Sequence, residues 1–227
     1  MSASVPTNFP FGITTPHVGG GGNAGLYGGG KVFFVSSVTG VAGNSGEDAD
    51  HAVTTIQLAL DKCTANNGDV IVCLPNHAET IVSSAASLDL DIAGITLIGL
   101  GNGEDRPTIT FGTADTADVD IDAANITIRN FIFHCNFDAL VGMIDVNADD
   151  FTMEDCLLRE SSGKQALIYV DVDGGAANAC DRCTIRRCEI ISISVGANSG
   201  IKLTEVQDRV TIEDCLIDGD FADAGIH

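Results

Sequence analysis

The 227-residue sequence has no tryptophan and only two tyrosines, Tyr27 and Tyr169. Tryptophan and tyrosine supply the flat, partly polar rings that are suited to stacking against a ligand at an exposed surface. The ten phenylalanines fall largely at positions with a core-like pattern. This shortage of exposed aromatic platforms counts against a groove that holds a polysaccharide.

Basic residues are also scarce, because 11 Lys and Arg stand against 32 Asp and Glu, which gives a formal charge of −21. A surface of that sign repels phosphate backbones and anionic lipid. The composition therefore disfavours nucleic acid and membranes as partners.

Long apolar runs are missing as well. No window approaches the roughly 18 consecutive apolar residues that a transmembrane helix requires. Residues 1–4 carry neither the basic region nor the apolar core of a secretory signal. We therefore expect synthesis in a cytoplasm, which disfavours a third class of function, that of a secreted bacterial adhesin.

A short motif recurs through the second half of the chain, with threonine between two apolar residues. Its copies are Ile95-Thr96-Leu97, Ile126-Thr127-Ile128, Phe151-Thr152-Met153, Cys183-Thr184-Ile185 and Val210-Thr211-Ile212. Successive threonines lie 31, 25, 32 and 27 residues apart. Alternation of apolar and polar residues indicates a half-buried strand, and an irregular repeat of this length indicates stacked coils. The motif predicts that the five threonines lie one above another.

The same alignment predicts three further columns. The position two residues after threonine is outward, and from the second coil its charges alternate in sign: Ile98, Arg129, Glu154, Arg186 and Glu213. Exposed pairs of this kind are each worth only a few tenths of a kcal/mol, but they oppose a shift of register. Two inward columns follow, one of Leu100, Phe131, Cys156, Cys188 and Cys215, the other of Phe133, Leu158, Ile190 and Ile217.

A second strand precedes each motif copy and again alternates apolar with polar residues. These strands are Leu88-Asp89-Leu90, Val119-Asp120-Ile121, Ile144-Asp145-Val146, Val170-Asp171-Val172 and Ile201-Lys202-Leu203. A sandwich would show hairpin strands every 8–12 residues, and leucine-rich repeats would show a different period and a leucine-asparagine frame. The pattern favours an all-β fold, a right-handed parallel β-helix.

The chain before the coils has its own organisation. Residues 1–30 are rich in Gly and Pro and cannot build a core, so they are expected to form a flexible arm. Residues 31–82 are expected to form a cap of strand, helix and strand, with the helix over residues 50–65 and Ile56, Ala59, Leu60 and Cys63 on its apolar face. The coils occupy residues 83–227 and end without a polar cap, so further chain or another subunit is expected to cover that end.

Three segments together resemble a known group of proteins. They are Lys31-Val32-Phe33-Phe34-Val35, the step Gly68-Asp69-Val70, and the turn Ile98-Gly99-Leu100-Gly101-Asn102-Gly103. With the helix that ends near Gly68 and the strand that ends at Pro75, the chain from residue 31 to 227 resembles pectate-lyase-like β-helix proteins from particles of tailed bacteriophages. The resemblance implies a homotrimer located in the virion.

Eight cysteines in a small secreted chain would suggest disulfides, but their placement here indicates another role. Cys156, Cys188 and Cys215 occupy an inward column, and Cys183 takes a core position of the threonine motif. The Cys180-Asp181-Arg182-Cys183 spacing is that of a zinc knuckle, yet its second cysteine points inward. We expect reduced, buried, core-filling thiols.

Outward aspartates of the second strands form the candidate metal site. Asp89, Asp120, Asp145 and Asp171 share one column, and Asp91, Asp122, Asn147 and Asp173 share the next outward position. Stacked carboxylates repel and should have raised pKa values unless cations or water intervene. Calcium, which prefers several oxygen ligands, would suit the first column. The alternative is that these carboxylates are simply hydrated.

No residue stands out as catalytic. A glycoside hydrolase needs two carboxylates about 5–10 Å apart with one protonated. Adjacent coils offer that spacing, but a supply of carboxylates is not evidence of catalysis. The lyase branch of this family places an arginine base near calcium-binding aspartates, whereas Arg129 and Arg186 already have partners in their column. We expect no cofactor other than calcium.

The functional expectation is therefore a structural subunit of a tailed-phage particle, a capsid decoration, fibre or spike. We expect it to contact capsid or tail proteins through residues 1–30. The alternative is a tail-spike depolymerase that cleaves a host surface glycan by hydrolysis or elimination.

Overall fold

The computed structural model describes residues 30–83, 88–173, 180–204 and 208–227. The predicted arm, residues 1–30, therefore lies outside the described residues apart from Gly30. Within the described residues, no helix has the length and apolar character needed to cross a bilayer.

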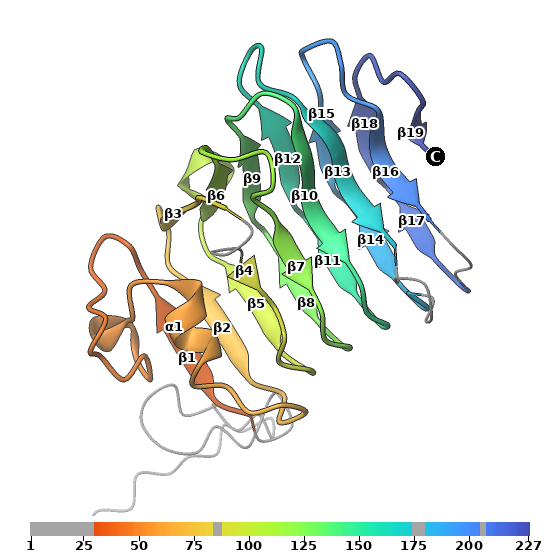
Figure 1. The fold of residues 1–227 in the computed structure, drawn as a ribbon. Coiled ribbons are helices and arrows are strands. Elements are labelled where there is room, and N and C mark those ends of the chain that lie inside the picture. The colour runs from red at the N-terminus through yellow and green to blue at the C-terminus, as the bar shows by residue number, and fades with distance from the viewer. Residues whose placement is uncertain (1–29, 84–87, 174–179, 205–207) are drawn as a thin grey trace, which may run out of the picture.

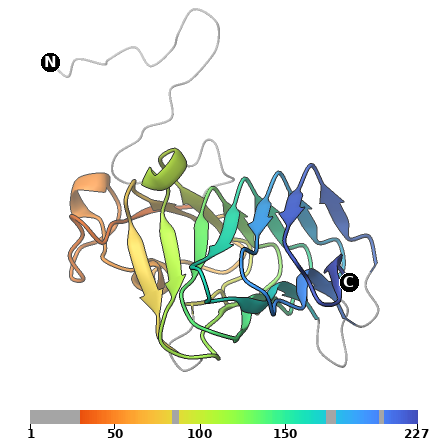
Figure 2. The same cartoon turned by 90° about the horizontal axis from the view of Figure 1, so that it is seen from above.

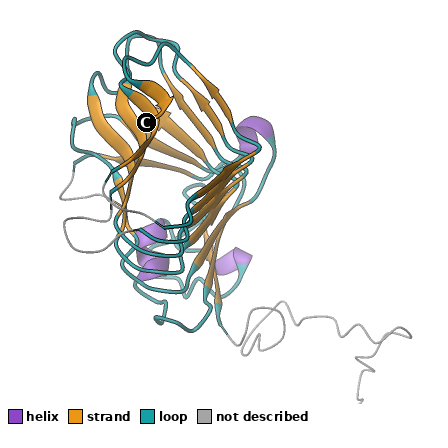
Figure 3. Cartoon of the chain, turned by 90° about the vertical axis from the view of Figure 1, so that its right-hand side faces the viewer, coloured by secondary structure: helices purple, strands orange, loops and turns teal. Residues whose placement is uncertain are grey.

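The chain forms a parallel β-solenoid whose coils follow one another along the molecule (Figures 1 and 2). Three parallel sheets form its walls, and a view along the stack shows them enclosing an interior (Figure 3). This confirms the predicted all-β, parallel β-helix class.

The first wall, here called the threonine sheet, carries the recurring motif. Its strands are β1 (Val32–Val35), β2 (Val70–Cys73), β5 (Thr96–Gly99), β8 (Thr127–Arg129), β11 (Thr152–Glu154), β14 (Thr184–Arg186) and β17 (Thr211–Glu213). Thr96, Thr127, Thr152, Thr184 and Thr211 pair in register. The predicted threonine column is confirmed.

The second wall, the aspartate sheet, carries the strands predicted before each motif copy. They are β4 (Leu88–Asp89), β7 (Val119–Ile121), β10 (Leu140–Val146), β13 (Ala166–Val172), β16 (Ser199–Leu203) and β19 (Ala224–Ile226). Lys202 pairs with Asp171, which confirms the register assigned to the fifth of these strands.

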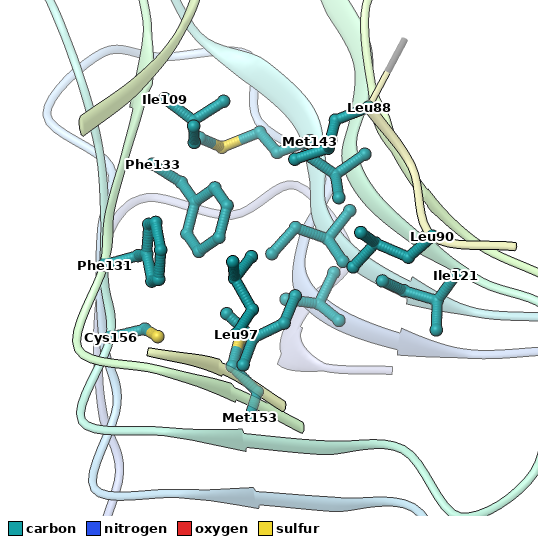
Figure 4. Packing of buried hydrophobic residues seen from close by; sticks show 14 of the residues in the cluster. Leu88, Leu90, Leu97, Ile109, Ile121, Phe131, Phe133, Met143, Met153 and Cys156 are labelled. Carbon is teal, nitrogen blue, oxygen red and sulfur yellow. The ribbon is translucent and has the colours of Figure 1, made fainter. Parts of the chain in front are cut away.

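The third wall closes each coil. Its strands are β3 (Ala78–Ile81), β6 (Thr108–Phe111), β9 (Ile132–Cys135), β12 (Leu157–Glu160), β15 (Glu189–Ile191) and β18 (Leu216–Asp218). The predicted column of Phe133, Leu158, Ile190 and Ile217 pairs in register here. Alternate side chains of all three walls point inward and form one continuous core, part of which is shown in Figure 4.

Single residues with positive φ turn the chain at both ends of the threonine sheet. The residues before the strands are Gly68, Gly94, Asn125, Asp150, Arg182 and Arg209. The residues after the strands are Asn130, Asp155, Arg187 and Asp214. Asn and Asp tolerate this left-handed conformation better than other non-glycine residues, whereas arginine adopts it at a cost. The three arginines therefore need compensating contacts.

The predicted helix is much shorter than residues 50–65. A 3-10 turn, η1 (Ala49–His51), is followed by α1 (Ile56–Leu60), because Val53 between them forms a β-bridge with Val35. The Thr55 side chain then caps the helix by accepting a hydrogen bond from the Leu58 N–H at 3.3 Å.

The buried face of the helix was predicted correctly in most of its residues. Ile56, Ala59 and Leu60 are buried, while Cys63 lies beyond the helix and is partly buried. The helix packs against β1 and β2 at the N-terminal end of the stack (Figure 1).

One predicted core position is wrong. Leu100 is 39% exposed, whereas Phe131, Cys156 and Cys188 of the same column are buried and Cys215 is partly buried. After β5 the chain leaves the coil through a turn and η3 (Gly103–Asp105), and it rejoins the coil at Pro107. Pro107 is buried and accepts a hydrogen bond from the Ile132 N–H, so it takes the place beside Phe131 that was assigned to Leu100.

Candidate functional site

The predicted aspartate column exists as a ladder on the outer face of the aspartate sheet. Asp89, Asp120, Asp145 and Asp171 pair one with the next across β4, β7, β10 and β13. Lys202 continues the column on β16, and its Nζ lies 3.2 Å from Asp171 Oδ2. The ladder therefore begins with carboxylates and ends with an ion pair.

Crowding and burial raise the pKa of several of these carboxyl groups. Burial, with the neighbouring charges of Asp171 and Asp120, raises the pKa of Asp145 to about 6, although a hydrogen bond from Asn147 opposes the shift. Burial followed by the charges of Asp122 and Asp91 also raises the pKa of Asp89. The expected raised pKa values are confirmed at these two positions.

Asp118 belongs to the same acidic surface, although the sequence pattern did not single it out. Burial is again the main cause, and together with the charges of Asp120 and Asp145 it raises the Asp118 pKa to about 6. One carboxyl oxygen of Asp118 and one of Asp89 are buried with no hydrogen-bond partner in the described structure. Asp118 lies directly before β7, outside the strand whose alternation defined the ladder, so the repeat gave no signal for it.

The calcium hypothesis for this ladder stays a prediction. Carboxylate oxygens are the correct ligand type. In the described ranges, however, no group of three or more His, Cys, Asp or Glu side chains is arranged so that it could hold a metal ion. Asn147 also replaces an aspartate in the second column, and its amide donates to Asp122 Oδ1 at 3.2 Å. Hydrated carboxylates remain the alternative.

The charge column of the threonine sheet is a true ion-pair network, but its central member is buried. Glu154 is 6% exposed, although we predicted an exposed position. Its carboxylate forms a salt bridge with Arg186, lies 2.9 Å from Arg187 Nη2, and lies 3.7 Å from Arg129 Nε. The predicted alternation is confirmed, and Arg187 joins it from the corner of the next coil.

Two bidentate pairs fasten the coil of β11 to the coil of β14 at both corners. Arg187 contacts Asp155 through Nε and Nη2, at 2.8 and 3.2 Å. Arg182 contacts Asp150 through the same two atoms, at 2.6 and 2.8 Å. Such planar pairs combine charge with fixed geometry. They are the compensating contacts for two of the arginines with positive φ.

Beside this network lies a cleft of about 280 Å³. Residues 99–107, here called the strap, run over its edge. The cleft is lined by Asn102, Gly103, Arg106, Asn130, Asp155, Cys156, Arg187 and Glu189. Its lining is mostly polar and comes from four consecutive coils.

Hydrogen bonds hold the strap against later coils. The Asn130 amide donates to the carbonyl oxygens of Gly99 and Gly101, at 2.8 and 3.1 Å. Arg106 Nη1 donates to the Asp155 carbonyl at 3.2 Å, and Arg159 makes a bidentate pair with Glu104 at 2.8 and 2.7 Å. The cleft therefore has a fixed edge.

The charged pair in the cleft is poorly suited to proton transfer. Hydrogen bonding to Asp155 raises the Arg187 pKa well above its usual range, so this guanidinium stays protonated. Hydrogen bonding from Arg187 lowers the Asp155 pKa, so this carboxyl stays ionised. General acid–base catalysis requires groups whose pKa lies near the working pH. The pair therefore supplies neither a neutral arginine that could act as a base nor a protonated carboxyl group that could act as an acid.

The cysteines behave as core residues. All eight are free thiols, six are buried, and Cys63 and Cys215 are partly buried. The Cys183 thiol donates to the Cys180 carbonyl oxygen at 3.3 Å, and hydrogen bonding with Cys180 lowers the Cys183 pKa. The CxxC spacing thus forms a buried pair, as expected.

Sequence reasoning also missed the buried carboxylate of Glu160, as it missed that of Asp69. Glu160 is 5% exposed, and its side chain accepts hydrogen bonds from Tyr169 and from the Ile193 and Ser194 N–H groups, the last two at 2.9 and 2.6 Å. It pairs with Cys135 in an inward column, and that position was the signal. Because its partners are a core tyrosine and a loop backbone, Glu160 holds the loop after β15 in place.

Comparisons with known proteins agree with this fold. No protein-family model matches the sequence, and no curated protein matches it. Among solved structures, the chain is similar to a rhamnogalacturonan lyase, with a TM-score of 0.55 and 14% sequence identity. The match covers 82% of this chain and 56% of the lyase, so the chain spans little more than half of that protein. The chain thus has the pectate-lyase-like β-helix fold, and at this identity the likeness concerns the fold alone.

Proposed function

We propose that this chain is a structural subunit of a tailed-phage particle, a rigid acidic rod on the capsid or tail. Residues 1–30 would attach it to other particle proteins. Its role would be mechanical and adhesive, which requires stiffness, solubility and a point of attachment but no reacting group.

One observation carries this proposal over a catalytic one. The arginines at the strap corner are held by carboxylates of neighbouring coils, as Arg187 is by Asp155 and Arg129 by Glu154. Groups locked in this way stiffen the stack and are withdrawn from proton transfer. The resemblance of residues 31–227 to phage particle proteins supports the biological setting.

A truncation tests the proposal. Without residues 1–30, the chain should fold with the melting temperature of the full chain but be missing from purified particles, as measured by mass spectrometry. Full-length chain expressed in parallel is the control. Full incorporation of the truncated chain would contradict attachment through the arm, and absence of the full-length chain from particles would contradict the particle role itself.

The second candidate is a polysaccharide depolymerase of the tail-spike type. It is favoured by the raised pKa values of Asp118 and Asp145, both about 6, on one acidic surface. A hydrolase keeps one carboxyl protonated beside an ionised one, and this surface offers such a contrast. Release of reducing sugar from host capsule that is abolished by Asp145→Asn would replace the structural proposal with this one.

A further inference from the structure

Asparagine is followed by glycine at two places in the chain, Asn67-Gly68 and Asn102-Gly103. At such a step the backbone nitrogen of glycine can attack the side-chain carbonyl carbon of asparagine, because glycine has no Cβ to obstruct the approach or to restrict rotation of the peptide. Both steps contain the same reacting groups. Their surroundings in the fold therefore decide which of them reacts.

The Asn67-Gly68 step is held by several contacts. Asn67 Nδ2 donates a hydrogen bond to Asp69 Oδ1 at 2.7 Å, and Asp69 is fully buried. The Asn67 N–H donates to the Thr64 carbonyl at 3.2 Å. The Gly68 carbonyl packs against the backbone of Gly30, where an added Cβ would lie 2.0 Å from the Gly68 oxygen. The side chain and the peptide of this step therefore cannot turn toward each other without breaking these contacts.

The Asn102-Gly103 step lies in the strap and is open. Asn102 is exposed and precedes η3 without a side-chain hydrogen bond to that turn. In the part of the chain that the structure describes, neither the Asn102 amide nor the Gly103 N–H has a hydrogen-bond partner. A Cβ built on Gly103 meets nothing within 4 Å. Only one hydrogen bond among the described residues, from the Asp105 N–H to the Asn102 carbonyl at 3.1 Å, resists rotation of the reacting peptide.

Two guanidinium groups, those of Arg106 and Arg187, line the same cleft as Asn102. During the attack the glycine nitrogen loses its proton, and negative charge develops on the side-chain oxygen of asparagine. Cations held near such a charge stabilise it. Arg106 is held in place, because its Nε donates to the Gly103 carbonyl at 3.0 Å and its Nη1 donates to the Asp155 carbonyl at 3.2 Å. The cleft therefore favours the reaction at Asn102.

We propose that Asn102 is a site of spontaneous modification, where asparagine is converted to aspartate and isoaspartate. A bond forms between the Gly103 nitrogen and Asn102 Cγ, and the side-chain nitrogen leaves as ammonia with the proton of the Gly103 N–H. This closes a cyclic imide. Water then opens the imide at either carbonyl. Cleavage of the bond from nitrogen to Cγ gives aspartate, and cleavage of the bond from nitrogen to the main-chain carbonyl carbon gives isoaspartate.

Both products change the cleft. Each of them adds a carboxylate to a cleft that Arg106 and Arg187 line, and guanidinium groups pair well with carboxylates. Isoaspartate also lengthens the strap backbone by one carbon atom, since the chain then runs through the former side chain, and this shifts the Gly103 carbonyl relative to Arg106. The edge of the cleft therefore changes as the protein ages. This inference does not depend on whether the rod is structural or cleaves a glycan.

Ageing of the folded full chain in neutral buffer, made with water enriched in the heavy oxygen isotope, tests the proposal. The isotope marks residues converted during the experiment, and fragmentation mass spectrometry locates them and separates isoaspartate from aspartate. Conversion at Asn102 should be at least about tenfold faster than at Asn67. In concentrated urea, where the fold is lost, the two residues should convert at similar rates.

Variants test the role of the surroundings. Gly103→Ala should slow conversion at Asn102 by about tenfold, because the added Cβ obstructs the attack. The matched control is Gly163→Ala, since Gly163 also has positive φ and open space around it, and it should leave the rate unchanged. Arg106→Gln should slow conversion by about threefold, less than the loss of a donor in an enclosed oxyanion site. Circular dichroism should show the same fold for every variant.

Two results would overturn the proposal. The first is equal conversion at Asn67 and Asn102 in the folded chain, which would show that the fold does not select the site. The second is conversion of Asn102 to aspartate without isoaspartate, which would indicate direct hydrolysis of the side chain by water.

Discussion

The coil of β14, β15 and β16 and the following coil of β17, β18 and β19 share one pattern but differ in burial. Ile185, Ile190 and Ile201 are fully buried, and each pairs in register with an isoleucine of the next coil. Those partners, Ile212, Ile217 and Ile226, are partly or largely exposed. Their own strands are intact. A core position in this fold is therefore buried by the next coil, more than by the strand that carries it.

The largest expected effect compares equivalent isoleucines in the two coils. Ile185→Ala should lower the free energy of unfolding by about 3 kcal/mol, because it removes buried methyl groups and leaves a cavity. Ile212→Ala should cost about 1 kcal/mol, since water already reaches that side chain. Urea denaturation measures both. Equal losses would show that burial does not depend on the following coil.

The ion pairs give the second comparison. Glu154→Gln should cost about 2 kcal/mol, because it leaves Arg186 and Arg187 without a buried carboxylate, and such losses exceed those at exposed pairs. Glu213 is exposed and lies 4.0 Å from Arg186, so Glu213→Gln should cost less than about 0.5 kcal/mol. High salt should reduce the difference between these two free-energy costs only slightly, because buried pairs are poorly screened. A cost at Glu213 that equals the cost at Glu154 would contradict the network.

The pattern of threonine and apolar residues was sufficient to predict the stacking, because alternation and repeat length are local signals that the fold repeats in every coil. It failed where the chain departs from the repeat. The strap displaced Leu100 from the core, and the bridge between Val35 and Val53 shortened the helix.

The cleft could not have been predicted from the sequence. Arg106, Asn130 and Arg187 come from different coils and meet only because an irregular loop folds back over the stack. The aspartate ladder was predictable, since its members share one position of the repeat. Asp118 was not, because it lies just outside the strand whose pattern defined that position.

The aspartate ladder gives a smaller, pH-dependent comparison between a crowded carboxyl and a paired one. The Asp145 pKa is about 6, above the value near 3.9 of an unfolded chain. The native state therefore holds this proton more tightly, so its stabilising effect is full below about pH 4 and is lost as the pH rises through 6.

Asp145→Asn should consequently raise the melting temperature at pH 8 and have less effect at pH 4. Partial exposure of the carboxyl screens the effect, so we expect about 1 kcal/mol, or about 2–4 °C. The control is Asp171→Asn, which leaves Lys202 without its partner and should not stabilise the protein. Calorimetry at both pH values measures the change in melting temperature. A lower melting temperature for Asp145→Asn at pH 8 would contradict the claim that the ionised Asp145 carboxylate destabilises the native state.

Calcium is expected to have the smallest effect. If the ladder binds it, millimolar calcium should raise the wild-type melting temperature by about 2–4 °C, and Asp120→Asn should remove the increase. Magnesium is the control, since it demands a stricter geometry. No change with calcium would leave hydrated carboxylates as the correct description.

The most direct measurement is an experimental structure of the full chain by crystallography. We predict that the Cα atoms of Thr127, Thr152 and Thr184 lie on one line at about 4.8 Å intervals, with Cys156 and Cys188 reduced in the interior. Threonines offset by one residue between coils, or a disulfide linking those two cysteines, would contradict the account.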